Sequence, residues 1–265
     1  MISGNLKKIK LRSLLKIWKP GMLATSDWLK SQGISQQLSY FYVQYDWIEK
    51  IAAGVFKRSS DHITWSSAVY ALQKLKKLPI HVGGLSAIEL HGRSHFIRNQ
   101  RAITLFGDVL MLPAWCNKID FDGTKLVYTK ASPWKSGFLE AITEYSKDSF
   151  EIQVSNLERA IMEFLSGVPQ HHTYEEAAHL MEALPSLRPI VVQSLLEKCR
   201  SVKVKRLFLH LATACQHSWV LKLDRSSIDL GKGIRQIEAK GYLDKQHLIY
   251  VPTEPLGDPY VKDLL

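Results

Sequence analysis

The residues of this chain that are best suited to act directly on a partner are polar side chains in the stretch 35–44. Apolar residues recur at helical spacing at Ile34, Leu38 and Phe41, and they predict the buried side of a helix. The start and the other side of this helix carry the candidate DNA-binding residues Ser35, Gln36, Gln37, Ser39, Tyr40 and Gln44. Because a glutamine amide can form two hydrogen bonds with adenine, this side predicts recognition of bases in the major groove.

Three cations after this helix suit contacts with phosphate, namely Lys50, Lys57 and Arg58. Residues 47–58 predict a strand, a turn at Ala53-Gly54 and a basic second strand. The cations would then lie on or beside a β-wing, where they meet the phosphate backbone and not the bases.

Two short helices and a turn are predicted to position the polar side. Thr25 or Ser26 can cap a first helix, residues 27–31, which ends near Gly33, and Ser35 can cap the second helix, residues 36–45. The order helix, turn, helix and wing is typical of winged helix-turn-helix domains. Helix-turn-helix geometry also occurs in domains that bind proteins, so a small helical subdomain without DNA binding is the alternative.

The positive charge is concentrated at the same end of the chain. Residues 1–79 contain 13 Lys and Arg against 4 Asp and Glu, a net charge of +9, whereas residues 80–265 contain 22 against 21, a net charge of +1. A phosphate backbone is the partner that uses this asymmetry most directly, because bound cations release its counterions.

Length and composition indicate two domains. With 265 residues, we expect a winged helix-turn-helix domain over residues 1–78 and a larger mixed α/β domain over residues 79–265, an α+β fold overall. No run of about 18 apolar residues occurs, so we expect a cytoplasmic protein without a signal peptide or membrane span. The three cysteines are far apart and form no CxxC pair, which argues against a disulfide framework and a zinc site.

Helical and extended patterns alternate through the rest of the chain. Residues 6–18 predict a basic amphipathic helix that completes the first core, although such a helix could also bind a membrane surface or a partner groove. We expect Ser155 and Glu158 to form a capping box and Gly83-Gly84 to turn the chain into a helix. The other predicted helices are residues 66–77, 85–90, 155–167, 174–184, 189–199 and 202–214, and the predicted strands are residues 101–112, a pair around Asp122-Gly123 within 115–128, 220–223 and 248–251.

Two groups in the second domain could carry metal chemistry. One consists of His171, His172 and His179 with the neighbouring acids Glu175 and Glu176, but the spacing matches no HExxH pattern, and solvated histidines at a helix start are the better interpretation. The other is Asp120 with Asp122, which could form a nuclease carboxylate pair, although a hairpin turn rich in Asp and Gly is the better interpretation. We therefore predict no metal ligand and no catalytic residue.

Two basic clusters stand out in the otherwise neutral second domain. Lys203, Lys205 and Arg206 form one, and Lys232 with Arg235 forms the other. Either they bind the carboxylates or phosphates of a partner, or they are a solvated face.

Several segments, in this order, resemble the AbiEi family of antitoxins from bacterial abortive-infection (type IV) toxin–antitoxin systems. GMLATSDWLKSQGIS and YDWIEKIAAGVFKR resemble the family's winged helix-turn-helix. LPIHVGGLSAIELHG, SNLERAIMEFL, VKVKRLFLHLA, HSW, IDLGKGIRQI and GYLD resemble its C-terminal antitoxin domain. The first motif is generic, but the ordered set is specific and covers most of the chain.

The resemblance implies a transcriptional autoregulator that binds operator DNA, expected as inverted repeats in its own promoter, and represses its own operon. It also implies antagonism of an AbiEii-type nucleotidyltransferase toxin, by contact or indirectly. It places antitoxin activity in the C-terminal domain, where the two basic clusters are the candidate surface, and it implies no cofactor.

An enzyme is the alternative from a different class. In that hypothesis the N-terminal domain delivers a metal-dependent nuclease or another catalytic domain to DNA. Such an enzyme needs convergent carboxylates, or a nucleophile with its base and orienting group, and the sequence provides no such set.

Overall fold

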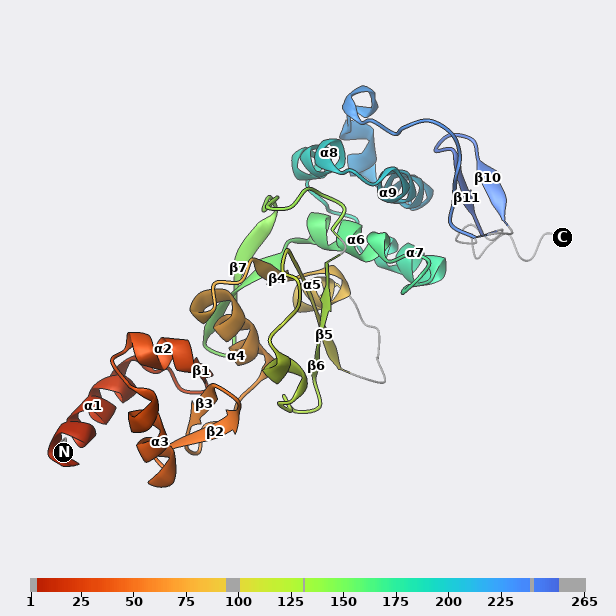
Figure 1. The fold of residues 1–265 in the computed structure, drawn as a ribbon. Helices are drawn as coiled ribbons and strands as arrows, with labels where there is room; N and C mark the ends of the chain where they lie inside the picture. Colours follow the sequence, from red (N-terminus) through yellow and green to blue (C-terminus); the bar gives the residue numbers. More distant parts are fainter. Residues whose placement is uncertain (1–3, 94–100, 131, 239–240, 253–265) are drawn as a thin grey trace.

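A computed structural model describes residues 4–93, 101–130, 132–238 and 241–252, with side chains from residue 9 onward. Figure 1 shows three parts in succession from the N-terminus: a small helical unit with a three-stranded sheet, a five-stranded sheet flanked by helices, and a group of helices that ends in another small sheet. Helices combined with mixed sheets confirm the predicted α+β class. Among the described residues, no helix has both the length and the apolar character needed to cross a membrane.

The N-terminal part has the predicted order of helix, turn, helix and wing. It contains α1 (Gly4–Ile17), β1 (Ala24–Thr25), α2 (Ser26–Ser31), α3 (Gln36–Gln44), β2 (Ile48–Ala52) and β3 (Val55–Arg58), with the strands in the order β1-β3-β2. The apolar stripe of α1 is only partly buried, because Leu14 and Trp18 lie in the core whereas Ile9 and Ile17 are exposed. The core that carries α3 therefore uses the C-terminal end of α1.

The next helix connects this part to the large sheet. It comprises α4 (Trp65–Tyr70) and a π-helical continuation, η1 (Ala71–Leu75). The side-chain amide of Gln73 donates to the Gln153 carbonyl at 3.1 Å and accepts from the Gln153 backbone amide at 2.8 Å. Ser66 donates to Asp148 at 2.8 Å. Lys76, just beyond η1, pairs with Asp27 of α2 at 3.3 Å. The predicted helix is thus present, but it contacts both parts instead of only closing the first.

The five-stranded sheet is mixed, with the order β6-β5-β4-β8-β7. Its strands are β4 (Ile80–Val82), β5 (Ala102–Gly107), β6 (Lys125–Thr129), β7 (Ile142–Lys147) and β8 (Phe150–Ser155). The central strand β4 runs antiparallel to β5 and parallel to β8, with Val82 opposite Val154. As predicted, Gly83-Gly84 turns the chain out of β4 into α5 (Gly84–Leu90), and Gly84 has a φ of +55° there.

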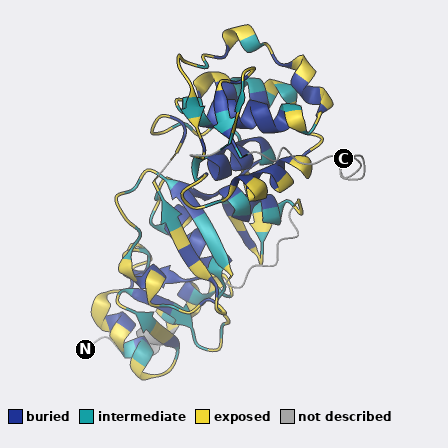
Figure 2. Cartoon of the chain, turned by 90° about the vertical axis from the view of Figure 1, so that its right-hand side faces the viewer, coloured by how far each residue is buried: buried dark blue, intermediate teal, exposed yellow. Residues whose placement is uncertain are grey.

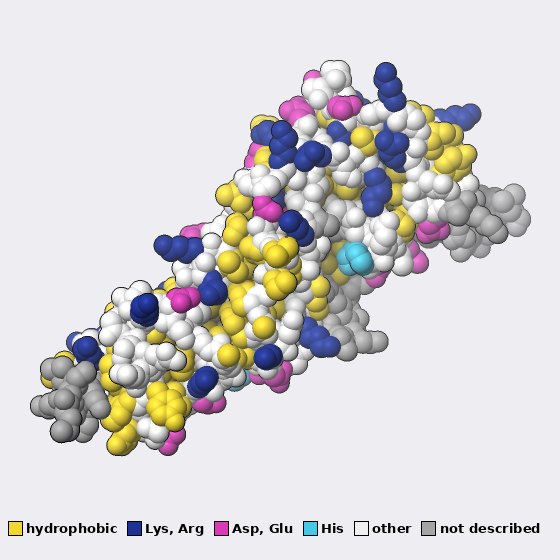
Figure 3. Space-filling model, viewed as in Figure 1, with side chains coloured by type: hydrophobic (Ala, Val, Ile, Leu, Met, Phe, Trp, Pro, Cys, Tyr) yellow, Lys and Arg dark blue, Asp and Glu magenta, His cyan; other side chains and the backbone are white. Residues whose placement is uncertain are grey.

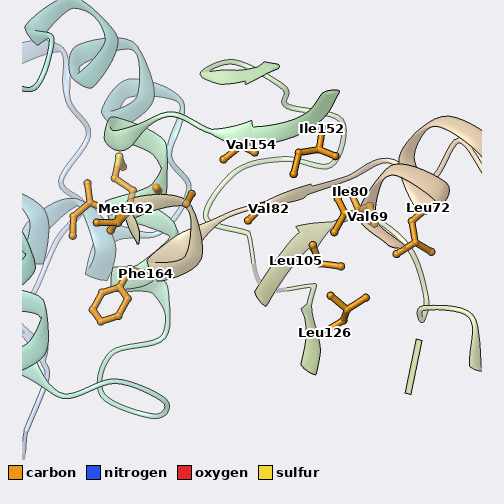
Figure 4. Close-up of a cluster of buried hydrophobic side chains, with 14 of the residues drawn as sticks. Val69, Leu72, Ile80, Val82, Leu105, Leu126, Ile152, Val154, Met162 and Phe164 are labelled. Carbon is orange, nitrogen blue, oxygen red and sulfur yellow. The ribbon is translucent and has the colours of Figure 1, made fainter. Parts of the chain in front are cut away.

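Helices and short strands make up the C-terminal part. These are α6 (Leu157–Ser166), α7 (Tyr174–Glu182), α8 (Pro189–Lys198), α9 (Val202–Ala214), the 3-10 helices η3 (Ser218–Lys222) and η4 (Arg225–Ser227), β9 (Arg235–Gln236), β10 (Tyr242–Asp244) and β11 (Ile249–Val251). Figure 4 shows one core running from Val69 and Leu72, through the strand residues, to Met162 and Phe164 of α6. Figure 2 shows that burial extends through all three parts.

Four local predictions were wrong in whole or in part. Residues 114–117 form a 3-10 helix, η2 (Ala114–Asn117), and the hairpin expected around Asp122-Gly123 is reduced to its turn, closed by an isolated antiparallel bridge between Phe121 and Thr124, because β6 pairs in parallel with β5. Residues 218–222 are a 3-10 helix and not a strand, and of the one or two strands expected over residues 101–112 one is present, β5, which ends at Gly107. The cap of α6 is Asn156, whose side chain accepts from the Arg159 amide at 3.1 Å, because Ser155 and Glu158 have other partners.

Candidate nucleic-acid interface

The turn between α2 and α3 is fixed by capping. Thr25 accepts a hydrogen bond from the Trp28 amide at 3.2 Å at the start of α2, and Ser35 accepts one from the Leu38 amide at 3.2 Å at the start of α3. Between them Gly33 has a φ of +77°, which L side chains rarely adopt. Both predicted caps and the glycine turn are therefore confirmed.

The exposed side of α3 carries most of the predicted polar set. Gln36, Gln37, Tyr40 and Gln44 are exposed, while Leu38 faces the core. Ser39 was expected on the same exposed side but is buried, with 6% of its surface exposed, and its hydroxyl donates to the Ser35 carbonyl at 3.1 Å. Ser39 therefore lies behind the exposed row and supports the first turn of the helix.

The wing is the hairpin β2–β3, with its turn at Gly54 (φ +72°), but its three cations differ in availability. Lys50 is exposed. The Lys57 ammonium lies 3.0 Å from Glu49 and donates to the Asp61 carbonyl at 3.0 Å. Arg58 donates to the Trp18 carbonyl at 3.2 Å. Lys57 and Arg58 thus hold the wing against the domain, and Lys50 is the wing cation best placed to meet a phosphate.

A groove of about 780 Å³ lies where α2, α3 and the wing meet. Its lining includes Ser35, Gln36, Tyr40 and Lys50 together with Lys30 near the end of α2. The sequence analysis did not select Lys30, although its place in the last turn of a predicted helix just before the turn was a usable signal. The groove combines hydrogen-bonding side chains with two lysines, which matches the chemistry of a nucleic-acid backbone, and its one acid, Asp27, is paired with Lys76 at 3.3 Å.

The first basic cluster of the C-terminal domain is not the open surface that was expected. Lys205 and Arg206 are buried, with 3% and 1% of their surfaces exposed, because α9 is covered along most of its length. Lys203 is half-buried, donates to the carbonyls of Ser166 and Val168, and has a pKa lowered by burial. This cluster stabilises the fold instead of presenting three free cations.

The second cluster remains at the surface. Lys232 is exposed, and Arg235 is half-buried beside it, with weak contacts to neighbouring carbonyls. On the face shown in Figure 3, Lys and Arg side chains lie over both ends of the molecule. The net charge therefore does not mark a single patch on that face.

Four of the metal and nuclease candidates have other contacts in the structure. His172 stacks on Phe164 with ring centroids 4.0 Å apart, and Glu176 completes a capping box with Thr173 at the start of α7. Asp120 accepts from the Gly123 amide at 2.7 Å. Asp122 contacts the exposed His62, 3.0 Å away. Within the described ranges, one other group, His210 with Asp244 and His247, brings three ligand atoms close enough to share a cation. The sequence analysis did not select that group.

Two family models, both of one family, match this chain. Residues 7–99 match the family model described as "Transcriptional regulator, AbiEi antitoxin N-terminal domain", and residues 100–252 match that described as "Transcriptional regulator, AbiEi antitoxin, Type IV TA system". The fold is similar to the crystal structure of the RV2827C protein from Mycobacterium tuberculosis, with a TM-score of 0.57 and 10% sequence identity over 90% of this chain and 88% of that one. No curated protein sequence matches the chain.

The two family matches together span residues 7–252, in the order expected from the sequence motifs. Their descriptions imply DNA and a toxin as partners in general. The chain belongs to the AbiEi antitoxins, the transcriptional regulators of type IV toxin–antitoxin systems.

Proposed function

We propose that this protein binds operator DNA in its own promoter, represses its own operon and antagonises an AbiEii-type nucleotidyltransferase toxin, without catalytic activity of its own. DNA binding is assigned to residues 1–78 and antitoxin activity to residues 79–265. The observation that carries the proposal is the exposed row Gln36, Gln37, Tyr40 and Gln44 on α3, beside a groove that contains Lys30 and Lys50.

The exposed residues of α3 and the lysines of the groove should affect DNA binding differently. A side chain that touches a base edge contributes roughly 1–3 kcal/mol of discrimination, whereas a phosphate contact contributes affinity without sequence preference. Gln37→Ala should therefore reduce the ratio of operator to random-DNA affinity by about 5- to 150-fold. Lys50→Ala should weaken both affinities alike and lower the slope of log affinity against log salt by about 0.9.

Fluorescence anisotropy with the full chain, its native promoter and a scrambled duplex over a salt series measures both effects. Gln170→Ala and Lys222→Ala change exposed residues of the same types far along the chain, and they are the matched controls. An unchanged affinity ratio in each of the alanine variants of Gln36, Gln37, Tyr40 and Gln44 would mean that another surface reads the sequence. If wild type showed no salt-dependent binding to the promoter, DNA binding itself would be refuted.

Antitoxin activity is tested at the basic cluster that remains exposed. Lys232→Glu combined with Arg235→Glu should impair the rescue of cells arrested by an AbiEii-type nucleotidyltransferase toxin, because charge complementarity sets encounter and specificity. Operator affinity should stay within a few-fold of wild type. Lys222→Glu is the control, and full rescue by the folded double variant would show that this cluster is only a solvated face.

The absence of catalysis is tested by incubating the protein with plasmid DNA and RNA in Mg²⁺ or Mn²⁺. No cleavage is expected, because Asp120 caps its own turn and Asp122 contacts His62. Cleavage that disappears in Asp120→Ala with Asp122→Ala would establish the nuclease alternative.

A further inference from the structure

A compact group of three ionisable side chains joins α9 to the C-terminal sheet. His210 lies on α9, Asp244 ends β10, and His247 lies in the turn before β11. The Nδ1 atoms of both histidines lie 2.6 Å from Oδ2 of Asp244. The three side chains are 5%, 12% and 2% exposed, respectively, so the group is closed to bulk water on most sides.

We propose that His210, Asp244 and His247 form a binding site for one divalent transition-metal cation, of which Zn²⁺ is the best match. Two imidazole nitrogens and one carboxylate oxygen are a ligand set that Zn²⁺ accepts, with a fourth position left for water. Calcium and magnesium are poorer candidates, because they prefer oxygen ligands.

The carboxylate of Asp244 is already held in a form suited to binding a cation. Its Oδ1 atom accepts hydrogen bonds from the amides of Gln246 and His247, at 2.8 and 3.2 Å, so the side chain cannot turn away and Oδ2 faces the two rings.

Both imidazoles can present an Nδ1 lone pair without breaking a hydrogen bond elsewhere. Nε2 of His210 lies 2.8 Å from the hydroxyl of Tyr174, and a hydroxyl can donate to this nitrogen or accept from it. Nε2 of His247 is the one buried side-chain N or O atom in the described part of the chain that has no hydrogen-bond partner. In the metal-free protein His247 donates its Nδ1–H to Asp244, and its proton can move to the unpartnered Nε2 when a cation takes the Nδ1 lone pair.

Binding requires a small adjustment and gains a supporting contact. Bonds of about 2.0–2.1 Å hold ligand atoms about 3.0–3.4 Å apart, so each 2.6 Å contact must lengthen by less than about 1 Å. With the cation on Nδ1 of His210, the Nε2–H group donates to Tyr174, as metal-bound histidines usually do to a neighbouring acceptor.

The test uses the untagged full chain, stripped with a chelator and then titrated with Zn²⁺ in competition with a chromophoric chelator. We expect one Zn²⁺ per chain. Asp244→Asn should weaken binding by more than about 100-fold, and Tyr174→Phe by about 10- to 100-fold. His62→Ala is the matched control, because His62 also contacts an aspartate, at 3.0 Å, but at the exposed surface. It should leave Zn²⁺ affinity unchanged.

A measurement on wild type keeps the proposal testable if Asp244→Asn does not fold. In nitrogen-15 spectra of labelled histidine rings, Zn²⁺ should shift the Nδ1 resonances of two of the ten histidines, with saturation at one equivalent. The absence of saturable binding, equal binding by wild type and Asp244→Asn, or shifts confined to other histidines would overturn the proposal. The group would then be a hydrogen-bonded clamp and not a metal site.

Discussion

Arg206 offers a direct test of how the C-terminal sheet is held to the helices. Its guanidinium is buried on α9 and donates to the carbonyls of Leu230 at 2.9 Å, Gly231 at 3.0 Å, Leu248 at 2.8 Å and Gly233. All four carbonyls belong to segments next to β9 and β11. One side chain of the helix therefore satisfies backbone acceptors from two parts of the C-terminal region.

Replacing Arg206 with Met keeps an apolar stem of similar length and removes every donor. A hydrogen bond to a charged group contributes about 1.5–3 kcal/mol, and an unsatisfied buried carbonyl is unfavourable by about 1–3 kcal/mol. The segment can limit this loss by opening to water. We therefore expect a destabilisation of about 3–5 kcal/mol that is confined first to the C-terminal sheet.

Native-state hydrogen exchange resolves this local effect. The amides of Arg235 and Ile237 donate to Leu248 and Tyr250 across the sheet, at 3.0 and 2.9 Å, and they should exchange more than about 100-fold faster in Arg206→Met. Lys232→Met alters an exposed cation of the same region and should change stability by less than about 0.5 kcal/mol. Wild-type exchange rates in Arg206→Met would mean that the four carbonyls find other donors. The role of Arg206 in holding the C-terminal sheet to α9 would then be refuted.

Three further variants test the interior. Glu163 accepts hydrogen bonds from Arg159 at 2.7 Å, Ser155 at 2.9 Å and the Gly84 amide at 3.1 Å. Glu163→Gln should therefore lower the free energy of unfolding, measured in urea, by about 3–5 kcal/mol. A loss under about 1 kcal/mol would contradict this expectation. Burial raises the pKa of Glu158, but hydrogen bonds from Arg188 at 2.9 and 3.0 Å outweigh burial and lower that pKa. The ionised carboxylate therefore stabilises the fold fully at pH values above the pKa of the unfolded state, about 4.3. The stability gap between wild type and Glu158→Gln should shrink as pH falls through the lowered folded pKa, and a gap that stays constant from pH ~7 to ~3 would contradict the assignment. A Cβ on Gly107 would lie 2.9 Å from Cα of Ile80, so Gly107→Ala should destabilise the β4–β5 pairing by about 1–3 kcal/mol in thermal unfolding, and an unchanged melting temperature would refute it.

The helix-turn-helix was predictable because its signals are local. The caps Thr25 and Ser35 and the turn glycine Gly33 act within three or four residues of their own positions. The long amphipathic helices of the C-terminal domain were found for the same reason, since their apolar period lies within one segment. By contrast, the sequence analysis did not predict the antiparallel hairpin formed by residues 142–155.

Burial of cations was not predictable from the same local patterns. Lys205 and Arg206 lie in a run that is typical of a helix with a basic start, but Leu230 and Leu248, which are distant in sequence, supply carbonyl partners to Arg206. The pairing of His210 with Asp244 likewise joins positions 34 residues apart. The only local signal for that group was the Asp-x-x-His spacing of Asp244 and His247.

The structure also decides how the two proposed activities should be separated. The boundary at residue 78 divides the charge of the chain, but Leu72 belongs to the continuous core, and Gln73 takes its backbone partners from Ile80 and Gln153, beyond that boundary. A fragment that ends at residue 78 would expose the apolar side of this helix to water and remove the backbone partners of Gln73, which destabilises the fragment for reasons unrelated to DNA. Point variants in the full chain change one surface at a time. They are therefore the sound way to distinguish operator binding at α3 from toxin antagonism at Lys232 and Arg235.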